Sequence, residues 1–185
     1  MVTISDQLQL IPITLEDQSD LFKLMQRIYP PAYAHFWHDQ GNWYINHVYG
    51  SESLKKDLSE IGSHYYFVRF RESVFNQDYK IIGIFKTIEN CTYPEQPDIS
   101  SFKIQRIYLD TTIQGKGIGK QLMQYAHDRA QATNHKLIWL DAMDQHPQAM
   151  HFYDRLGYQK GGLQCLDFEL LHLPYRPMWY LYKHL

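Results

Sequence analysis

The chain has 185 residues, of which 44% are hydrophobic and 21% are charged, a mixture typical of globular proteins rather than of disordered or collagen-like chains. This length favours a single domain that spans residues 1–185. Eighteen lysine and arginine residues against twenty acidic residues give a net charge of −2, which argues against a protein that binds nucleic acid through bulk positive charge.

The first third of the chain predicts one strand followed by several helices. Alternating apolar residues over 8–13 indicate a short opening strand. Thr14 and Asp17 form a Ser/Thr-x-x-acid helix start. We expect Pro30 and the proline after it to end this helix, because proline lacks the amide donor and restricts the residue before it. Residues 32–61 are expected to be helical in pieces.

The middle of the chain predicts three strands, a glycine-rich turn and a helix. The three strand patterns cover residues 65–70, 81–88 and 102–109. A polar turn over residues 72–79 joins the first two strands. The glycine-rich turn at residues 114–119 leads into a helix with one apolar face. A short apolar strand follows at residues 137–140, as expected of a buried central strand.

The last third of the chain predicts one helix and two strands. Pro147 suits the first turn of the helix, and Gly157 suits its end. Apolar residues then alternate over 166–170 and again over 178–182, which predicts two final strands, the last of them exposed. The element order describes an α/β or α+β fold with one clear strand–helix–strand crossover near residues 102–140.

The glycine-rich turn has the composition of a phosphate-binding loop. Glycine lets the backbone turn sharply, and the free amides and dipole of a following helix favour an anion. The spacing excludes two common motifs, because Gln114 and Gln121 replace P-loop residues and Lys120 replaces a glycine of the dinucleotide fingerprint. From spacing alone, a phosphate site and a simple tight connection are equally compatible with this turn.

Three segments together resemble the GNAT family of N-acetyltransferases. Residues 114–119, Gln-Gly-Lys-Gly-Ile-Gly, match the family's Gln/Arg-x-x-Gly-x-Gly/Ala signature. Residues 104–109 are similar to its fourth strand, and residues 149–158 resemble its Ala-x-x-Phe-Tyr-x-x-x-Gly-Phe helix. The resemblance covers about residues 102–160. It implies a mixed, mostly antiparallel twisted sheet of about six to seven strands, flanked by about four helices.

The resemblance implies a binding site for acetyl-coenzyme A. The turn would cradle the pyrophosphate through the backbone amides of Gly115, Gly117, Ile118, Gly119 and Lys120. Gln114 and Lys116 would lie beside it. The pantetheine arm would run along the strand at Ile107 and Leu109, like an added strand. His146 stands where the family often has an asparagine that caps a helix and contacts the coenzyme, so we expect a poorer cap there, with Asp144 as a substitute.

The resemblance also implies a catalytic role for Tyr153, as general acid to the departing thiolate. Two alternatives stay open: a core tyrosine, and a hydroxyl that only orients the thioester. Gln105 stands where many relatives carry glutamate, and a neutral amide cannot accept a proton. The base is therefore expected to be water or one of four side chains: Asp141, Glu89, Asp39 or His38.

The aromatic-rich segment near the start is compatible with packing in the core and with a ligand groove. The resemblance implies that it lines the acceptor groove, through Tyr33, Trp37 and Tyr44. Cation–π contact with an ammonium group is compatible with such residues. The likeness within the family is greatest to bacterial polyamine acetyltransferases of the PaiA type. His35 and His38 would share a helix face but lack a third ligand, so no metal is expected.

The sequence thus predicts an acetyl-coenzyme A-dependent N-acetyltransferase. The acceptor would be a small-molecule or peptide primary amine, which attacks the thioester directly in a ternary complex. The alternative is a coenzyme-binding sensor on the same fold. We expect a monomer or homodimer without nucleic acid or membrane as partner. A cytoplasmic location is expected, because the chain shows neither a transmembrane run nor the basic and apolar blocks of a secretion signal.

Overall fold

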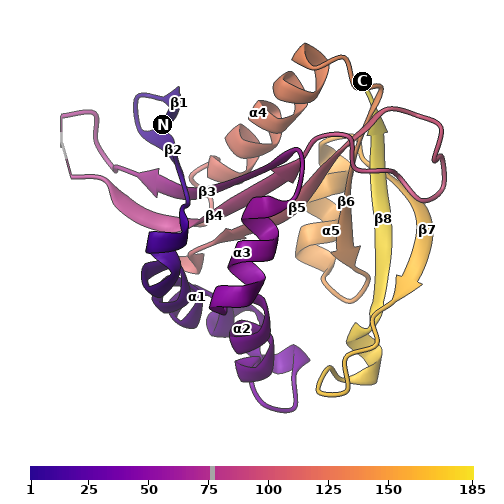
Figure 1. The fold of residues 1–185 in the computed structure, drawn as a ribbon, viewed down its shortest axis with the longest axis horizontal. Helices are drawn as coiled ribbons and strands as arrows, with labels where there is room; N and C mark the ends of the chain where they lie inside the picture. The colour runs from indigo at the N-terminus through magenta and orange to yellow at the C-terminus, as the bar shows by residue number, and fades with distance from the viewer. Residues whose placement is uncertain (76–77) are drawn as a thin grey trace.

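The computed structural model describes residues 1–75 and 78–185, so two residues of the turn predicted over 72–79 lie outside the described part. One 8-stranded sheet runs through the molecule in the order β1-β2-β3-β4-β5-β6-β8-β7 (Figure 1). Its strands are β1 (Val2–Ser5), β2 (Leu8–Pro12), β3 (Ser63–Phe70), β4 (Lys80–Ile88), β5 (Ser101–Leu109), β6 (Leu137–Met143), β7 (Gln159–Cys165) and β8 (Pro177–His184). The α-helices are α1 (Gln18–Tyr33), α2 (Asn42–Val48), α3 (Ser51–Ser59), α4 (Ile118–Ala132) and α5 (Pro147–Arg155).

The predicted fold class is confirmed, with slightly more strands and helices than expected. Every strand pair is antiparallel except β5 with β6, which α4 connects as the expected crossover. The strand β1 was not predicted. The Thr14 start is confirmed, because the Asp17 carboxylate accepts from the Thr14 amide at 2.8 Å. It begins a short 3-10 turn, Leu15–Asp17, which runs directly into α1.

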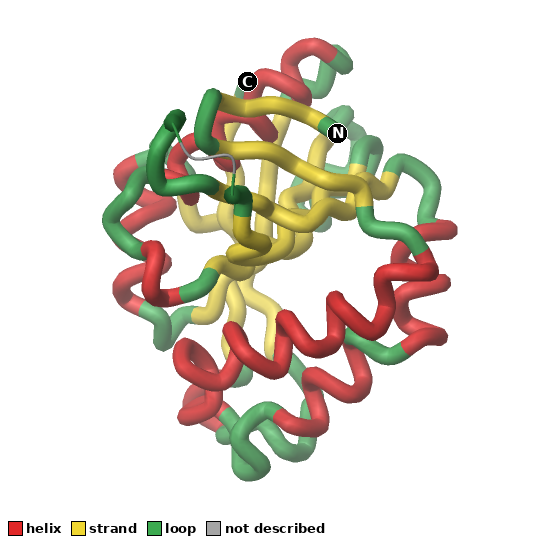
Figure 2. Tube along the Cα trace, turned by 90° about the vertical axis from the view of Figure 1, so that its left-hand side faces the viewer, coloured by secondary structure: helices red, strands yellow, loops and turns green. Residues whose placement is uncertain are grey.

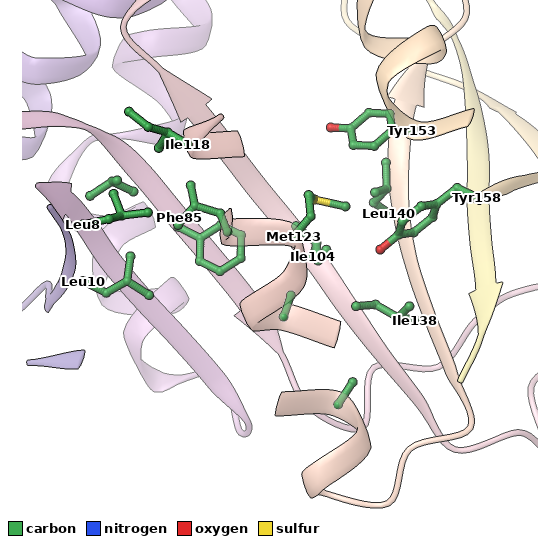
Figure 3. Close-up of a cluster of buried hydrophobic side chains, with 14 of the residues drawn as sticks. Leu8, Leu10, Phe85, Ile104, Ile118, Met123, Ile138, Leu140, Tyr153 and Tyr158 are labelled. Carbon is green, nitrogen blue, oxygen red and sulfur yellow. The ribbon is translucent and has the colours of Figure 1, made fainter. Parts of the chain in front are cut away.

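The helices cover both faces of the sheet (Figure 2). On one face, α4 and α5 pack on a core that joins the two halves of the sheet (Figure 3). This core includes Leu8, Leu10, Phe85, Ile104, Ile118, Met123, Ile138, Leu140, Tyr153 and Tyr158. On the other face, α1, α2 and α3 bury a second core around Met25, Ile45, Leu54, Phe67 and Ile84. Each such side chain stabilises the fold by roughly 1.5–3 kcal/mol, before packing effects. No helix in the described residues is both long and apolar enough to cross a membrane.

The strands β5 and β6 separate part-way along their length. Their parallel pairing runs only from Ser101 opposite Leu137 to Ile104 opposite Leu140, although both strands continue. At that point β5 contains a bulge, because Thr87 of β4 pairs with Ile104 and the preceding residue of β4 pairs with Arg106. The skipped residue is Gln105. A bulge increases local twist, which turns the end of β5 away from β6.

The first helix is longer than expected, because its prolines lie inside its last turn. Both Pro30 and Pro31 belong to α1, and the carbonyl of Pro30 still accepts from the Ala34 amide. The φ angle that the proline ring imposes is compatible with a helix, so only amide donors are lost. The rings of Tyr29 and Tyr33 on this turn pack 4.9 Å apart between centroids, which helps to hold the turn in place.

The strands at the end of the chain also differ from the prediction. Residues 166–170 form a loop, and the strand before it is β7, whose polar sequence with two glycines hid it. Glycine at position 161 leaves room for the Tyr93 side chain, because a Cβ at Gly161 would lie 1.9 Å from the Tyr93 hydroxyl. The apolar alternation over 166–170 reflects packing against the core beneath α1 and α2. The expectation of an exposed last strand is wrong, since β8 lies between β6 and β7.

Candidate active site

The glycine turn adopts a conformation that only glycine accepts easily. Gly115 has a φ of 80° and Gly117 a φ of 72°, both left-handed. A Cβ built at either position has no described residue within 4 Å, so contacts with the described chain do not require glycine there. The two residues therefore serve the path of the backbone and leave open room in front of it.

The amides of this turn are free to bind a ligand. No acceptor among residues 1–75 and 78–185 receives a hydrogen bond from the amides of residues 115–120, whereas the Gln121 amide donates to the Gly117 carbonyl at 3.1 Å. These amides open α4, where the helix dipole is positive. Ile118 offers only its amide, because its side chain is buried in the core. An anion fits this arrangement.

The two lysines of the turn behave differently. Lys116 forms an ion pair with Glu72 at 2.5 Å, and this contact lowers the pKa of the Glu72 carboxyl. Lys120 is exposed in the first turn of α4. The Lys116 ammonium is thus directed to the β3–β4 connection, while Lys120 stays beside the free amides.

A cleft of about 400 Å³ opens where β5 and β6 separate. Ile107 and Gln105 of β5 line it, together with Asp141 of β6. The Oε1 atom of Gln105 is buried and has no hydrogen-bond partner in the described chain. An unpaired buried acceptor is costly, which makes it a candidate contact for a ligand donor. Leu109, predicted beside the coenzyme, does not line the cleft and packs against the core under α4.

The helix α5 places Tyr153 and His146 in the same cleft. Tyr153 is 9% exposed, and its hydroxyl points away from Tyr158 and β8 (Figure 3). Burial raises the pKa of this hydroxyl, which therefore keeps its proton. The Phe152 ring would lie 3.3 Å from a Cβ at Gly119, so the start of α4 adjoins α5.

His146 caps α5 through one long hydrogen bond. Its Nδ1 accepts from the Ala149 amide at 3.3 Å, and Pro147 occupies the first turn. Burial lowers the pKa of His146, so the ring is neutral at pH 7, and its proton is on Nε2. Asp144, the expected substitute cap, instead accepts from the Trp179 indole at 2.7 Å.

Aromatic side chains form the opposite wall of the cleft. The expected residues Tyr33, Trp37 and Tyr44 all line it. Tyr108 and Phe168 also line the cleft and were not predicted to do so. The hydroxyls of Tyr44 and Tyr108 lie 3.1 Å apart, and the rings of Tyr33 and Tyr108 meet edge-on at 5.5 Å between centroids. The wall thus draws on helices, a strand and the loop before β8.

Comparison with known proteins agrees with this geometry. The model of the acetyltransferase (GNAT) domain matches residues 63–160, which include the turn, the bulged strand and α5. The chain belongs to the GNAT family. An uncharacterized N-acetyltransferase from the pepI 3' region of Lactobacillus delbrueckii subsp. lactis is 25% identical over 114 residues. That alignment spans 62% of this chain and 62% of the relative.

Solved GNAT-like structures have the same fold over nearly the whole chain. Spermidine N-acetyltransferase from Vibrio cholerae, in complex with CoA and spermine, is 19% identical, with a TM-score of 0.65 over 97% of this chain and 96% of the other. PaiA N-acetyltransferase from Thermoplasma acidophilum, in complex with coenzyme A, is 16% identical, with a TM-score of 0.65 over 96% and 99% of the two chains. At these identities the likeness concerns the fold.

The GNAT cleft separates the four side chains that were candidate bases. Only Asp141 lines it, and its carboxylate pairs with Lys103 at 2.6 Å. Asp39 accepts from two amides at the start of α2, and Glu89 pairs with Arg129 at 2.9 Å outside the cleft. His38 packs against His172, with 3.8 Å between ring centroids.

Some features of the GNAT site escaped the sequence analysis. The sequence shows that Gln105 stands where many relatives carry glutamate, but the bulge and its unpartnered oxygen depend on the pairing of β5 with β4. Phe168 lies far along the chain from Trp37, whose ring it meets at 6.0 Å between centroids. The sequence signal for Phe168 is the apolar alternation over residues 166–170, which predicts a strand rather than a loop that lines the cleft. The described residues contain no cluster of three side chains able to hold a metal.

Proposed function

We propose that this protein transfers the acetyl group of acetyl-coenzyme A to a primary amine, by direct attack within a ternary complex. One observation carries the proposal: Tyr153 lines the cleft between β5 and β6, and α5 adjoins the start of α4, whose first amides have no acceptor in the described chain. The free amides provide an anion site, and the cleft provides room for a thioester and an acceptor.

The coenzyme would be held mainly by backbone groups. The amides of Gly115, Gly117, Ile118, Gly119 and Lys120 would bind the pyrophosphate, with Gln114 and Lys116 nearby. The arm would follow the backbone of β5 from Ile107 toward Leu109, whose side chain packs in the core, along the edge where pairing with β6 has ended. His146 would adjoin this arm through its Nε2–H. Bound acetyl-coenzyme A supplies the activated acetyl thioester.

Tyr153 would donate a proton to the departing thiolate. Its hydroxyl is protonated and belongs to a residue that lines the cleft, so it can donate to the sulfur as negative charge develops there. The amine must arrive neutral, and an alkyl amine with a pKa of about 10.4 is neutral in fewer than about one molecule per thousand at pH 7. Asp141 is the side chain best placed to take the proton, directly or through water, because it lines the cleft.

The replacement of the usual glutamate by Gln105 favours one alternative, a coenzyme-binding sensor without turnover. Titration calorimetry with acetyl-coenzyme A tests the binding site, and thiol release with a panel of amines tests turnover. Micromolar binding with thiol release and an acetylated amine, identified by mass spectrometry, is expected. Binding without release for every amine would favour the sensor, and absence of binding would refute both.

A glycine variant tests the turn directly. Gly117→Ala introduces a side chain at a left-handed φ and is expected to weaken acetyl-coenzyme A binding at least about tenfold. Gly157→Ala is a matched control, because Gly157 has a φ of 83° at the end of α5, away from the turn. Equal binding by the two variants would contradict the assigned pyrophosphate site.

A further inference from the structure

The acceptor side of the cleft is walled by the faces and edges of aromatic rings. The rings of Tyr29 and Tyr44 stack at 4.9 Å between centroids, and Trp37 stacks on Phe168 at 6.0 Å. Tyr33 meets Tyr108 edge-on. All six residues line the cleft. Aromatic walls of this kind recognise flat apolar groups through stacked and edge-to-face contacts.

The polar ends of this wall are largely occupied within the protein. The Trp37 indole donates to the Tyr29 hydroxyl at 2.9 Å, and the hydroxyls of Tyr44 and Tyr108 bond to each other. Burial raises the pKa of Tyr33 to about 12, so this hydroxyl is neutral rather than a phenolate that would hold a cation. The aromatic residues of the wall therefore offer a ligand mainly apolar ring surface and few polar atoms.

The charges in the cleft do not suit a polycation. Asp141 is the one carboxylate among its described lining residues, and it is already paired with Lys103. Besides Lys103, Arg106 is a cation that lines the cleft, and its guanidinium pairs with Asp57 of α3. A single ammonium can lie over an aromatic ring, but each further buried ammonium needs an anion of its own. The cleft offers none unpaired among the described residues.

The Gln105 side chain is a candidate contact for the amino group of the acceptor. Gln105 lies on the β5 bulge and lines the cleft, while its Oε1 atom is buried and has no hydrogen-bond partner among the described residues. An attacking amine carries N–H donors, and rotation of the Gln105 side chain toward the cleft would let one of them reach this acceptor while the nitrogen lone pair faces the thioester. Gln105 then orients the amine without taking its proton.

We propose that the acceptor is an aromatic monoamine, a flat ring on a short alkyl arm, with the ring against Tyr33, Tyr108 and Phe168 and the amino group at Gln105. This inference rests on the proposed acetyltransferase function and names its substrate class. It differs from the polyamine expectation, because a polyamine brings several ammonium groups into a cleft whose carboxylate is already neutralised.

Steady-state thiol release with 2-phenylethylamine and with spermidine tests the proposal, with products identified by mass spectrometry. We expect kcat/KM to be at least about tenfold higher for 2-phenylethylamine. Phe168→Leu and, independently, Tyr33→Leu are each expected to lower kcat/KM for the aromatic amine about tenfold, mainly through KM. Phe75→Leu is the matched control, because Phe75 is 94% exposed on the β3–β4 connection. Calorimetry with acetyl-coenzyme A reports whether each variant is folded and binds the coenzyme.

The outcomes separate this inference from the proposed function. Turnover that favours spermidine would overturn the aromatic acceptor and leave the acetyltransferase intact. Turnover of neither amine, nor of any other in the panel, despite coenzyme binding would overturn both. If Phe168→Leu and Tyr33→Leu bind the coenzyme and match Phe75→Leu in KM, the aromatic wall does not select the acceptor.

Discussion

Replacement of Tyr153 by phenylalanine isolates one hydroxyl in the cleft. The ring remains in the core beneath α5, and no group in the described chain hydrogen-bonds to the hydroxyl. Its removal therefore leaves no protein partner unsatisfied. We expect the free energy of unfolding to change by less than about 1 kcal/mol.

The catalytic effect is expected to be much larger. A positioned general acid contributes about 10²–10⁴-fold. A tyrosine hydroxyl is protonated throughout the neutral range, and burial raises the pKa of Tyr153 further, so the residue is a donor at every pH of the assay. We expect Tyr153→Phe to lower kcat at least about 100-fold, which corresponds to about 2.7 kcal/mol of barrier. The affinity for acetyl-coenzyme A is expected to stay nearly unchanged.

The assay is thiol release at saturating acetyl-coenzyme A, with chemical denaturation to follow stability. Tyr158→Phe is the matched control, because Tyr158 is 8% exposed in the same core, 6.0 Å from the Tyr153 ring, and does not line the cleft. If Tyr153→Phe retains kcat within about threefold, the hydroxyl contributes less than about 0.7 kcal/mol and the acid role is refuted. Equal losses in both variants would indicate a packing effect instead.

Three further predictions concern stability. Asp57→Asn is expected to lower the free energy of unfolding in denaturant by about 3 kcal/mol, because Asp57 pairs with Arg106 and with the fully buried Lys86. Glu52→Gln on the same helix removes an exposed ion pair and should lower it far less. Equal losses in the two variants would contradict this prediction. The pKa of His146 lies below 6.5, so the unfolded chain binds more protons and the free energy of unfolding should fall as pH drops below about 6.5. His146→Asn keeps a capping side chain and should make the free energy of unfolding less dependent on pH between pH 7.5 and 5.5. An unchanged pH dependence would exclude His146 as its source. Asp17→Ala should cost about 1 kcal/mol by removing the Thr14 capping contacts, whereas Asp20→Ala in α1 serves as a control.

Features that depend on neighbouring residues were predictable from the sequence. The left-handed glycines at residues 115 and 117 follow from the one residue type that accepts such a backbone at little cost. The helix start at Thr14 and the helix end at Gly157 are similar cases. The first depends on hydrogen bonds to Asp17, and the second on the φ angle of one glycine. The order of strands and helices around residues 102–160 carried the family resemblance for the same reason.

The cleft itself depends on contacts between distant parts of the chain. Whether Asp141, Glu89, Asp39 or His38 faces it follows from where β5 and β6 stop pairing, and no local pattern encodes that point. The contact of Phe168 with Trp37 depends likewise on packing, which overrode the strand expected over residues 166–170. Local backbone preferences act over a few residues, whereas strand separation and aromatic packing sum many weak contacts across the fold, so only the folded chain brings Tyr153, Gln105 and the aromatic wall together.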